Sequence, residues 1–474
     1  MNAAANLSGM TDEEKDALIS TLLAHITKQD ERIKDLERRL GLNSENSNKP
    51  PSSDGYDKKS RQTNLREKTD RKTGGQTGHK GSNLPQVDNP NRIIDHCPVV
   101  CAGCGESVGV SQSTGYGRRQ VFDIPKPQPI DVTEHRTHRC HCLHCGTNTD
   151  AVFPDGVTAP TQYGANIAAV VVYLQQWHLV PEDRLAELIR DIFGLDLTSA
   201  TIAAMSQRKA EQWNDLADHI GEAVKKAPVK HMDETGLRVC AALHWLHVAS
   251  TWLLTFYRAP LRRNAMMEGV RGIIIHDFWK PYLGMVGVTH GLCNAHHLRE
   301  LKALILWDKE PWALQMYRFL RHTCHAVNLS RERKQPLDPT FVKWLWARYD
   351  RIIAQGLACH EAQVPLDPPN IKKRGRPRQR KGHNLLERLR DHKDDALRFL
   401  TTPDVPFTNN QAERDIRMMK LKQKISGCFR TETGARNFAI LRTVLSTARK
   451  QGWNILDTLS SPPDMLVQNL RVAG

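Results

Sequence analysis

The sequence predicts a multidomain α+β protein whose mixed β-sheet is flanked by helices and interrupted by a helical insertion. At Pro228 the spacing of apolar residues changes from a helical to an extended period. Short apolar runs then alternate with helical segments up to about residue 293, which is typical of a mixed sheet. A heptad helix, a pair of CxxC motifs and a wholly helical stretch precede the sheet.

Length and charge limit the class of protein. A chain of 474 residues is long enough for about three domains. Its 67 Lys and Arg against 52 Asp and Glu give a net charge of +15 and a pI near 9.3, which favours a nucleic-acid partner. The 11 cysteines lack the spacing of a secreted scaffold, and neither a signal peptide nor a membrane-length apolar run is found. We therefore expect a cytoplasmic protein with reduced thiols and no membrane partner.

Changes of composition and period divide the chain into segments. The expected segments are 1–42 (a coiled-coil or leucine-zipper-like helix), 43–90 (a basic flexible linker), 91–155 (a zinc-binding module), 160–226 (a helical domain), 227–452 (the sheet domain, with its insertion at about 294–400) and 453–474 (a C-terminal tail).

The first segment predicts one long helix. Thr11 and Glu14 form a capping box, and the helix should run to about Leu40. Apolar residues recur every seven positions at Ile19, Ile26, Ile33 and Leu40. This heptad seam favours self-association, and the alternative is a single amphipathic helix packed on its own chain.

Two CxxC motifs predict one structural zinc ion. Its expected ligands are Cys101, Cys104, Cys142 and Cys145, because paired thiolates one turn apart chelate Zn²⁺ from two sides. A zinc ribbon with strands over 117–125 and 130–140 would fit between the motifs. Neighbouring cysteines and histidines leave the ligand set open.

Residues 161–225 should be wholly helical. A helix that opens after Pro181, a turn at Gly194 and a second helix capped by Thr198 or Ser199 resemble a helix-turn-helix unit. An ordinary corner between two helices has the same pattern, so DNA recognition here stays open.

Five strands are expected in the sheet domain. Residues 229–259 predict three strands, with turns at Thr235–Gly236 and near Thr251, and strands follow at 272–277 and 285–293. A helical patch is expected over 262–270. Asp233 should end the first strand and Asp277 follows the fourth, at the edge of an α/β sheet where sites gather.

The insertion carries a basic loop, KKRGRPRQRKG, with the form of an AT-hook. The extended Arg-Gly-Arg core at Arg374, Arg376 and Arg378 fits an A·T-rich minor groove. A solvated surface loop is the alternative.

A basic helix begins near FTNNQAERDIR. Thr408 and Gln411 suggest a capping box, which would place Glu413 one turn inside the helix. Arg414, Arg417 and Lys420 follow on this helix and are candidate DNA contacts. A simple surface pair between Glu413 and Arg417 is the alternative. A second helix over about 433–450 should cover the sheet.

Asp233, Asp277 and Glu413 are candidate ligands of two Mg²⁺ or Mn²⁺ ions. Converging carboxylates repel each other unless divalent cations neutralise them, and two such ions suit in-line phosphoryl transfer. Glu234 and Glu300 are rival acids. Glu234 should point to the opposite face of its strand from Asp233.

Several motifs together resemble the insertion sequence 66 family of bacterial DDE transposases. They are HMDETGLRV, IIIHDFWKPY, GLCNAHHLREL, KRGRPRQRKGHNLLERL and, most specifically, the block around NNQAERDIR. The resemblance implies a ribonuclease-H-like catalytic core with Asp233, Asp277 and Glu413 as its acids, and it selects Glu413 over Glu300.

The resemblance also implies an enzyme of a bacterial insertion sequence that acts on DNA at the nucleoid. It would nick element ends and join the freed 3′-hydroxyls to target DNA, binding double-stranded terminal inverted repeats, with companion proteins from the same element. The alternative function is a catalytically inactive DNA-binding protein or repressor of that element.

Overall fold

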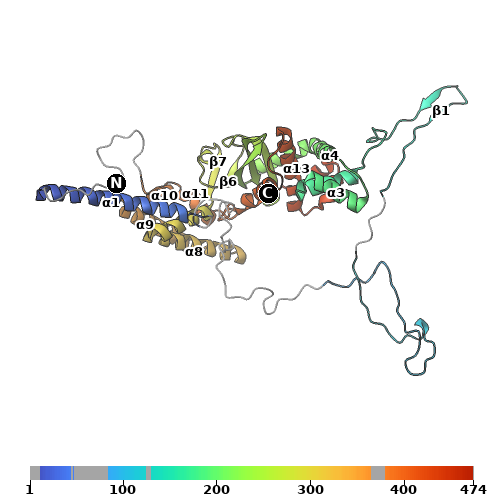
Figure 1. The fold of residues 1–474 in the computed structure, drawn as a ribbon, viewed down its shortest axis with the longest axis horizontal. Coiled ribbons are helices and arrows are strands. Elements are labelled where there is room, and N and C mark those ends of the chain that lie inside the picture. Colours follow the sequence, from blue (N-terminus) through green and yellow to red (C-terminus); the bar gives the residue numbers. More distant parts are fainter. Residues whose placement is uncertain (1–10, 44–45, 47–83, 124–129, 364–378, 473–474) are drawn as a thin grey trace. The chain divides into compact units, whose positions relative to one another are not determined.

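A computed structural model describes residues 11–43, 46, 84–123, 130–363 and 379–472 (Figure 1). The chain forms two compact units. One comprises Met1–Lys59, Glu134–Asp191 and Leu195–Gly474, and the other comprises Ser60–Thr133 and Ile192–Gly194. The first unit contains the five-stranded sheet.

The sheet has the strand order β5-β4-β3-β6-β7. Strands β3 to β5 are antiparallel, whereas β3, β6 and β7 run parallel. The five strands expected from the sequence are confirmed, as β3 (Val229–Val239), β4 (Ala242–Ser250), β5 (Thr255–Leu261), β6 (Gly272–His276) and β7 (Val288–Leu292).

The turn expected at Thr235–Gly236 is wrong, because β3 continues through both residues. Gly236 pairs with Trp245 of β4, and its carbonyl accepts a hydrogen bond from Gln423 Nε2 at 3.1 Å. A glycine inside a strand can thus mark a close approach of neighbours instead of a turn. The hairpin turn lies at Cys240–Ala241, both of which have positive φ angles (48° and 64°). The turn expected near Thr251 is confirmed.

The helical patch expected at 262–270 is also wrong. The segment makes only turn-type backbone bonds, from Ala265 N to the Arg262 carbonyl and from Met266 N to the Asn264 carbonyl. Gly269 then adopts a φ of 74°, outside the helical region.

Two helices cover one face of the antiparallel strands. Leu237, Leu246 and Val248 share a core with Ile416 of α12 (Asn410–Ser426) and Phe438 of α13 (Glu432–Gln451). The expected helix over 433–450 is therefore confirmed. On the opposite face, Gly221 of α5 (Asn214–Lys226) packs against the Phe256 ring.

The segment 161–225 is helical as expected. It contains α2 (Ala165–Val172), a π-helical turn (Tyr173–Trp177), α3 (Glu182–Phe193), α4 (Ser199–Gln212) and α5. Thr198 caps α4, since its hydroxyl accepts a hydrogen bond from Thr201 N at 3.2 Å. The buried Arg442 of α13 donates to the Gln176 carbonyl at 3.3 Å, so these helices and α13 share packing.

The insertion is a helical subdomain with its own core. Figure 1 shows several of its helices gathered beside β6 and β7, and α11 contacts β7 directly. The helices are α7 (Asn294–Ala303), α8 (Pro311–Arg333), α9 (Pro339–Glu361), α10 (Lys381–Asp391) and α11 (Lys393–Thr401), with a π-helical turn at Leu304–Asp308. Buried Trp312, Tyr349 and Leu386 occupy its centre.

The N-terminal helix α1 (Asp12–Gly41) has the expected capping box, with Thr11 N donating to Glu14 Oε2 at 2.9 Å. The C-terminal end of α1 contacts the insertion, where Arg38 pairs with Asp308 at 3.1 Å. Along the rest of the helix the heptad residues Ile19, Ile26 and Ile33 are each 52% exposed. The contact with its own chain therefore leaves the seam open.

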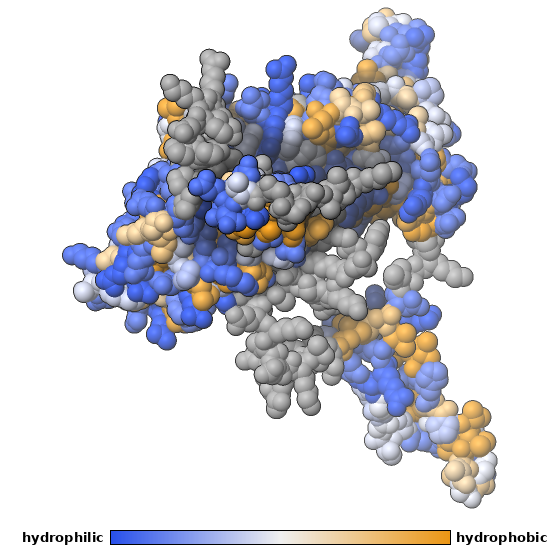
Figure 2. Space-filling view, turned by 60° about the vertical axis from the view of Figure 1, so that its left-hand side comes forward, coloured by the Kyte–Doolittle hydropathy of each residue, from blue (hydrophilic) through white to orange (hydrophobic). Residues whose placement is uncertain are grey.

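Two short helices follow α13 near the C-terminus, namely α14 (Ile455–Ser460) and α15 (Pro463–Gln468). A further short helix, α6 (Lys280–Leu283), lies between β6 and β7. None of the helices described here is both long and apolar enough to cross a membrane. Hydrophilic residues predominate on the face shown in Figure 2.

The strands expected between the CxxC motifs differ from those found. Residues 117–123 form no strand, and of 130–140 only Arg139 and Cys140 belong to one. That strand, β1 (Arg139–His141), pairs with β2 (Asn148–Asp150) across the second CxxC turn. Val121 is 92% exposed, so among the described residues it gains little apolar packing that would hold a strand in place.

Candidate functional site

Asp233 and Asp277 lie on neighbouring parallel strands. Asp233 was expected at the end of its strand, but it lies in the middle of β3, because β3 does not turn at Gly236. Val229 pairs with Ile273 and His231 with Ile275. This register, continued by two residues, brings Asp233 level with Asp277, which directly follows the end of β6. Asp233 thus lies beside the end of β6, the strand that pairs in parallel with β3.

Local backbone bonds orient both carboxylates. Glu234 N donates to Asp233 Oδ1 at 2.9 Å, and Trp279 N donates to Asp277 Oδ1 at 3.0 Å. In each acid, Oδ1 therefore accepts a hydrogen bond from the nearby backbone, and Oδ2 is the oxygen that a ligand could use.

Glu413 enters from α12, in the first turn of the helix. The capping box expected at Thr408 and Gln411 is wrong, because the N-cap residue is Asn409 and its side chain makes no capping bond. That side chain instead bonds to β3, where Asn409 Nδ2 donates to the Met232 carbonyl at 2.7 Å and Oδ1 accepts from His231 Nδ1 at 2.9 Å. Asn409 is buried, so these bonds tie the start of α12 to the strand that carries Asp233.

The charges of the other two acids act on Asp233. Burial raises the pKa of Asp233 well above its usual value, and the charges of Glu234, Asp277 and Glu413 raise it further. Burial also acts to raise the pKa of Glu413. The hydrogen bond and charge of His296, together with Arg299 and Arg417, outweigh that effect and lower it. The site therefore holds a charged Glu413 beside an Asp233 that resists ionisation, an arrangement that a cation would relieve.

The rival acids have other partners. Glu234 accepts hydrogen bonds from the Tyr282 hydroxyl at 2.8 Å and from Arg263 Nη2 at 3.1 Å. Glu300 forms an ion pair with Arg388 of α10. Both carboxylates are thus neutralised by protein groups.

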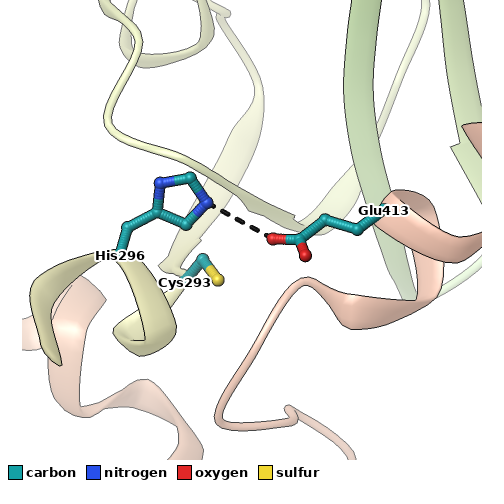
Figure 3. A group of neighbouring side chains, drawn as sticks. All are labelled: Cys293, His296 and Glu413. Carbon is teal, nitrogen blue, oxygen red and sulfur yellow. Dashed lines mark hydrogen bonds and ion pairs between the residues drawn. The ribbon is translucent and has the colours of Figure 1, made fainter. Parts of the chain in front are cut away.

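Cys293 and His296 adjoin Glu413, and neither was expected in the site. One donor atom from each of the three residues lies within 4.8 Å of the others. Figure 3 shows the three side chains together. His296 Nε2 is 3.3 Å from Glu413 Oε1, and Asn409 N donates to Cys293 Sγ at 3.1 Å. Burial and the Glu413 charge raise the pKa of the Cys293 thiol to about 12. The Cys-x-x-His spacing at the end of a strand is the sequence signal that could have pointed to this pair.

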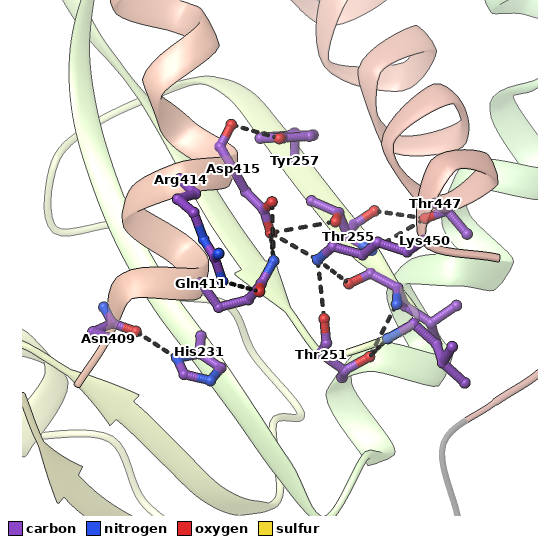
Figure 4. A network of polar contacts seen from close by, with 12 residues as sticks. His231, Thr251, Thr255, Tyr257, Asn409, Gln411, Arg414, Asp415, Thr447 and Lys450 are labelled. Carbon is purple, nitrogen blue, oxygen red and sulfur yellow. Dashed lines mark hydrogen bonds and ion pairs between the residues drawn. The ribbon is translucent and has the colours of Figure 1, made fainter. Parts of the chain in front are cut away.

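A buried network anchors α12 to the sheet and to α13 (Figure 4). Lys450 Nζ of α13 is 2.7 Å from Asp415 Oδ2, and both side chains are 13% exposed. The Tyr257 hydroxyl of β5 donates to the Asp415 carbonyl at 2.7 Å. Asp415 lies two residues after Glu413, so this network fixes the helix on which Glu413 stands.

Three basic residues of α12 reach the surface. Arg414, Arg417 and Lys420 are exposed, and Lys420 Nζ donates to the Gly236 carbonyl at 3.4 Å. Arg374, Arg376 and Arg378 of the AT-hook sequence lie outside the described residues.

Each CxxC pair occupies a tight turn. Gly105 N donates to the Cys101 carbonyl at 2.9 Å, and Gly146 N donates to the Cys142 carbonyl at 2.8 Å. Both glycines have positive φ angles (81° and 72°), which favour glycine. Hydrogen bonds from Cys104 and Gly103 lower the pKa of Cys101, and those from Thr147 lower that of Cys145. The pairs belong to different compact units, so the four-ligand zinc site stays a prediction.

Comparison with known proteins gives two family matches. Residues 160–437, well over half of the chain, match the family described as "Transposase IS66 family". Residues 4–85 match a family of unknown function, DUF6444. No curated protein matches the chain. The first match contains the sheet, the insertion and all three candidate acids.

Proposed function

Since the chain belongs to the IS66 family of transposases, we propose that it is an active DDE transposase whose acids are Asp233, Asp277 and Glu413. The strand order, with three antiparallel strands followed by two parallel ones, supports a ribonuclease-H-like core. The single observation that carries the proposal is the convergence of three elements: the parallel register brings Asp233 level with Asp277, and Asn409 ties the start of α12, which carries Glu413, to β3.

The family implies the use of divalent metal ions, and the donor set fits that requirement. Asp233, Asp277 and Glu413 supply carboxylate oxygens, which are the ligands that Mg²⁺ and Mn²⁺ prefer. Two such ions would stabilise the charge that develops in phosphoryl transfer. Backbone bonds to Asp233 and Asp277 and the Asn409 bonds to β3 hold the acids in place before metal or DNA binds.

The proposed reaction has two steps. Water attacks a phosphorus atom at the element end, and the 3′-oxygen of the neighbouring nucleotide leaves and takes up a proton. The freed 3′-hydroxyl then loses its proton and attacks a phosphorus atom of the target, and the displaced 3′-oxygen of the target takes up a proton. The protein positions the DNA against the three acids, and the reaction consumes no cofactor.

DNA binding follows from the family, and the basic residues are candidate contacts. The exposed Arg414, Arg417 and Lys420 lie on the helix that carries Glu413, which would bring phosphates to the acids. The loop with Arg374, Arg376 and Arg378, the helices of 160–226 and a zinc module are proposed to bind element ends. The chain is also proposed to self-associate through α1 and to act together with companion proteins from the same element.

The test of function uses the purified chain and a duplex that carries an element end with flanking DNA. We expect nicking with Mg²⁺ or Mn²⁺ and binding without nicking in Ca²⁺, because the longer and looser coordination of Ca²⁺ suits in-line transfer poorly. Specific binding without nicking in any of these metals, with companion proteins of the element also present, would favour the alternative of an inactive DNA-binding protein or repressor.

A further inference from the structure

Glu413 belongs to a second group of metal-ligand atoms besides the three acids. The sulfur of Cys293, an imidazole nitrogen of His296 and a carboxylate oxygen of Glu413 lie within 4.8 Å of one another. Thiolate, imidazole and carboxylate are the ligands of zinc and related transition metals, and they differ from the all-oxygen set of Mg²⁺.

The three ligands come from two elements that the fold holds together. Cys293 is the N-cap residue of α7, and His296 stands in the first turn of the same helix. Glu413 stands in the first turn of α12, and Asn409 joins the two helix starts, because its backbone N–H donates to the Cys293 sulfur. Figure 3 shows the imidazole and the thiol facing the carboxylate across the space between these helices.

Solvent reaches the group at His296 and Glu413. Cys293 is 1% exposed, whereas the side chains of His296 and Glu413 are 20% and 26% exposed. Three protein ligands with one open side are typical of zinc sites that keep a fourth position for water or substrate.

We propose that Cys293, His296 and Glu413 bind one transition-metal ion of the Zn²⁺ or Co²⁺ type. On binding, a metal–sulfur bond forms and the thiol proton leaves to solvent. The ion occupies the Glu413 carboxylate, which is then no longer available to a Mg²⁺ or Mn²⁺ ion held by Asp233 and Asp277. The inference concerns a metal of different chemistry at the edge of the proposed active site, and it rests on the proposed function only for the consequence that the two metals compete for Glu413.

The experiment titrates Co²⁺ into the metal-free full-length chain, and its parent protein carries Cys101→Ser, Cys104→Ser, Cys142→Ser and Cys145→Ser, so that cobalt cannot enter the CxxC motifs. A cobalt–thiolate bond gives a near-ultraviolet charge-transfer band. We expect one equivalent of Co²⁺ to produce this band in the parent, Cys293→Ser to abolish it, and His296→Asn to weaken binding at least tenfold. Cys324→Ser removes a part-buried thiol of α8 outside the group and is the matched control, with the band unchanged.

An absent band in the parent, or a band that Cys293→Ser retains because cobalt has entered another cysteine site, would overturn the inference. Should Cys293→Ser fail to fold, the partly exposed His296 gives the same test without disturbing the core.

Asp277→Asn separates the two proposals. It should abolish nicking and leave the cobalt band intact. A chain that gives the band but never nicks DNA would contradict the proposed function and leave the metal site standing.

Discussion

At the scale of single residues, burial decides which side chains carry charge around the acids. His231 and His276 flank the acids in sequence, and burial lowers the pKa of each to about 4. Both are therefore neutral at pH 7, and His231 can serve as a plain hydrogen-bond donor to Asn409. Positive charge near Glu413 comes instead from His296, Arg299 and Arg417.

The pKa of His231 predicts acid sensitivity. In the unfolded chain this histidine binds a proton below about pH 6.5, whereas in the fold it stays neutral down to about pH 4. Its contribution to stability is therefore present above pH 6.5 and is lost as the pH falls toward 4, by on the order of 2–3 kcal/mol. Urea unfolding of the parent and of His231→Gln between pH 7 and 4.5 measures this. The glutamine amide can still donate to Asn409 without titrating, so the difference between the proteins should shrink or reverse at low pH, and parallel curves would refute the prediction.

At the scale of elements, α12 is the part whose placement matters most. Its polar contacts join it to β3 through Asn409 and to β5 and α13 through Asp415. Because the ion pair of Asp415 with Lys450 is largely buried, removing one partner leaves a charge without compensation.

Lys450→Met should therefore lower the free energy of unfolding by about 3–5 kcal/mol, the usual cost of breaking a buried pair. The double variant Asp415→Asn with Lys450→Met should recover part of that loss, since no unpaired charge remains. Denaturant unfolding of the two single variants and the double variant measures the coupling. Simple addition of the single effects would show that the pair is not coupled.

The zinc module gives a second prediction for an element. If Cys101, Cys104, Cys142 and Cys145 bind one Zn²⁺, Cys104→Ser should release it and unfold residues 95–150, because structural zinc contributes folding free energy. Metal analysis and limited proteolysis measure both effects. Cys240→Ser, at an exposed cysteine in the β3–β4 turn, is the control. Purified parent protein without zinc would reject the module.

The sequence was sufficient for the five strands of the sheet and for the helices of 161–225, the insertion and 433–450, since the periods of apolar residues are strong there. It was insufficient where distant contacts decide local structure. Cys240–Ala241 forms a hairpin turn without the glycine or asparagine that usually marks one, and Gly236 lies in a strand beneath α12. The bonds of Asn409 to β3 and the proximity of Cys293 to Glu413 join residues more than 100 positions apart, which no local pattern encodes.

At the scale of the whole molecule, the chain offers an open seam along α1. Ile19, Ile26 and Ile33 are each half exposed, and the ion pair that joins α1 to the insertion comes from Arg38, near the C-terminal end of the helix. An exposed row of large apolar side chains at heptad spacing favours pairing with a second copy.

Replacement of Ile26 and Ile33 by glutamine should accordingly shift the protein to a smaller species in sedimentation velocity. Two glutamines in place of the exposed Leu306 and Leu314 of the insertion are the matched control and should leave the mass unchanged. The same mass for the α1 variant and the parent would leave the seam without a role in self-association.

The most direct test of the transposase mechanism is strand cleavage by amide variants of the acids. Asp233→Asn, Asp277→Asn and Glu413→Gln each remove a negative ligand with little change of volume. Cleavage of an element-end duplex in Mg²⁺ should fall by at least about 100-fold in each, since the metal ions would supply much of the rate, and DNA binding should persist. Glu300→Gln, which loses only its pairing with Arg388, should still cleave. Loss of cleavage in Glu300→Gln together with near-parental cleavage in Glu413→Gln would contradict the assignment of the third acid to α12.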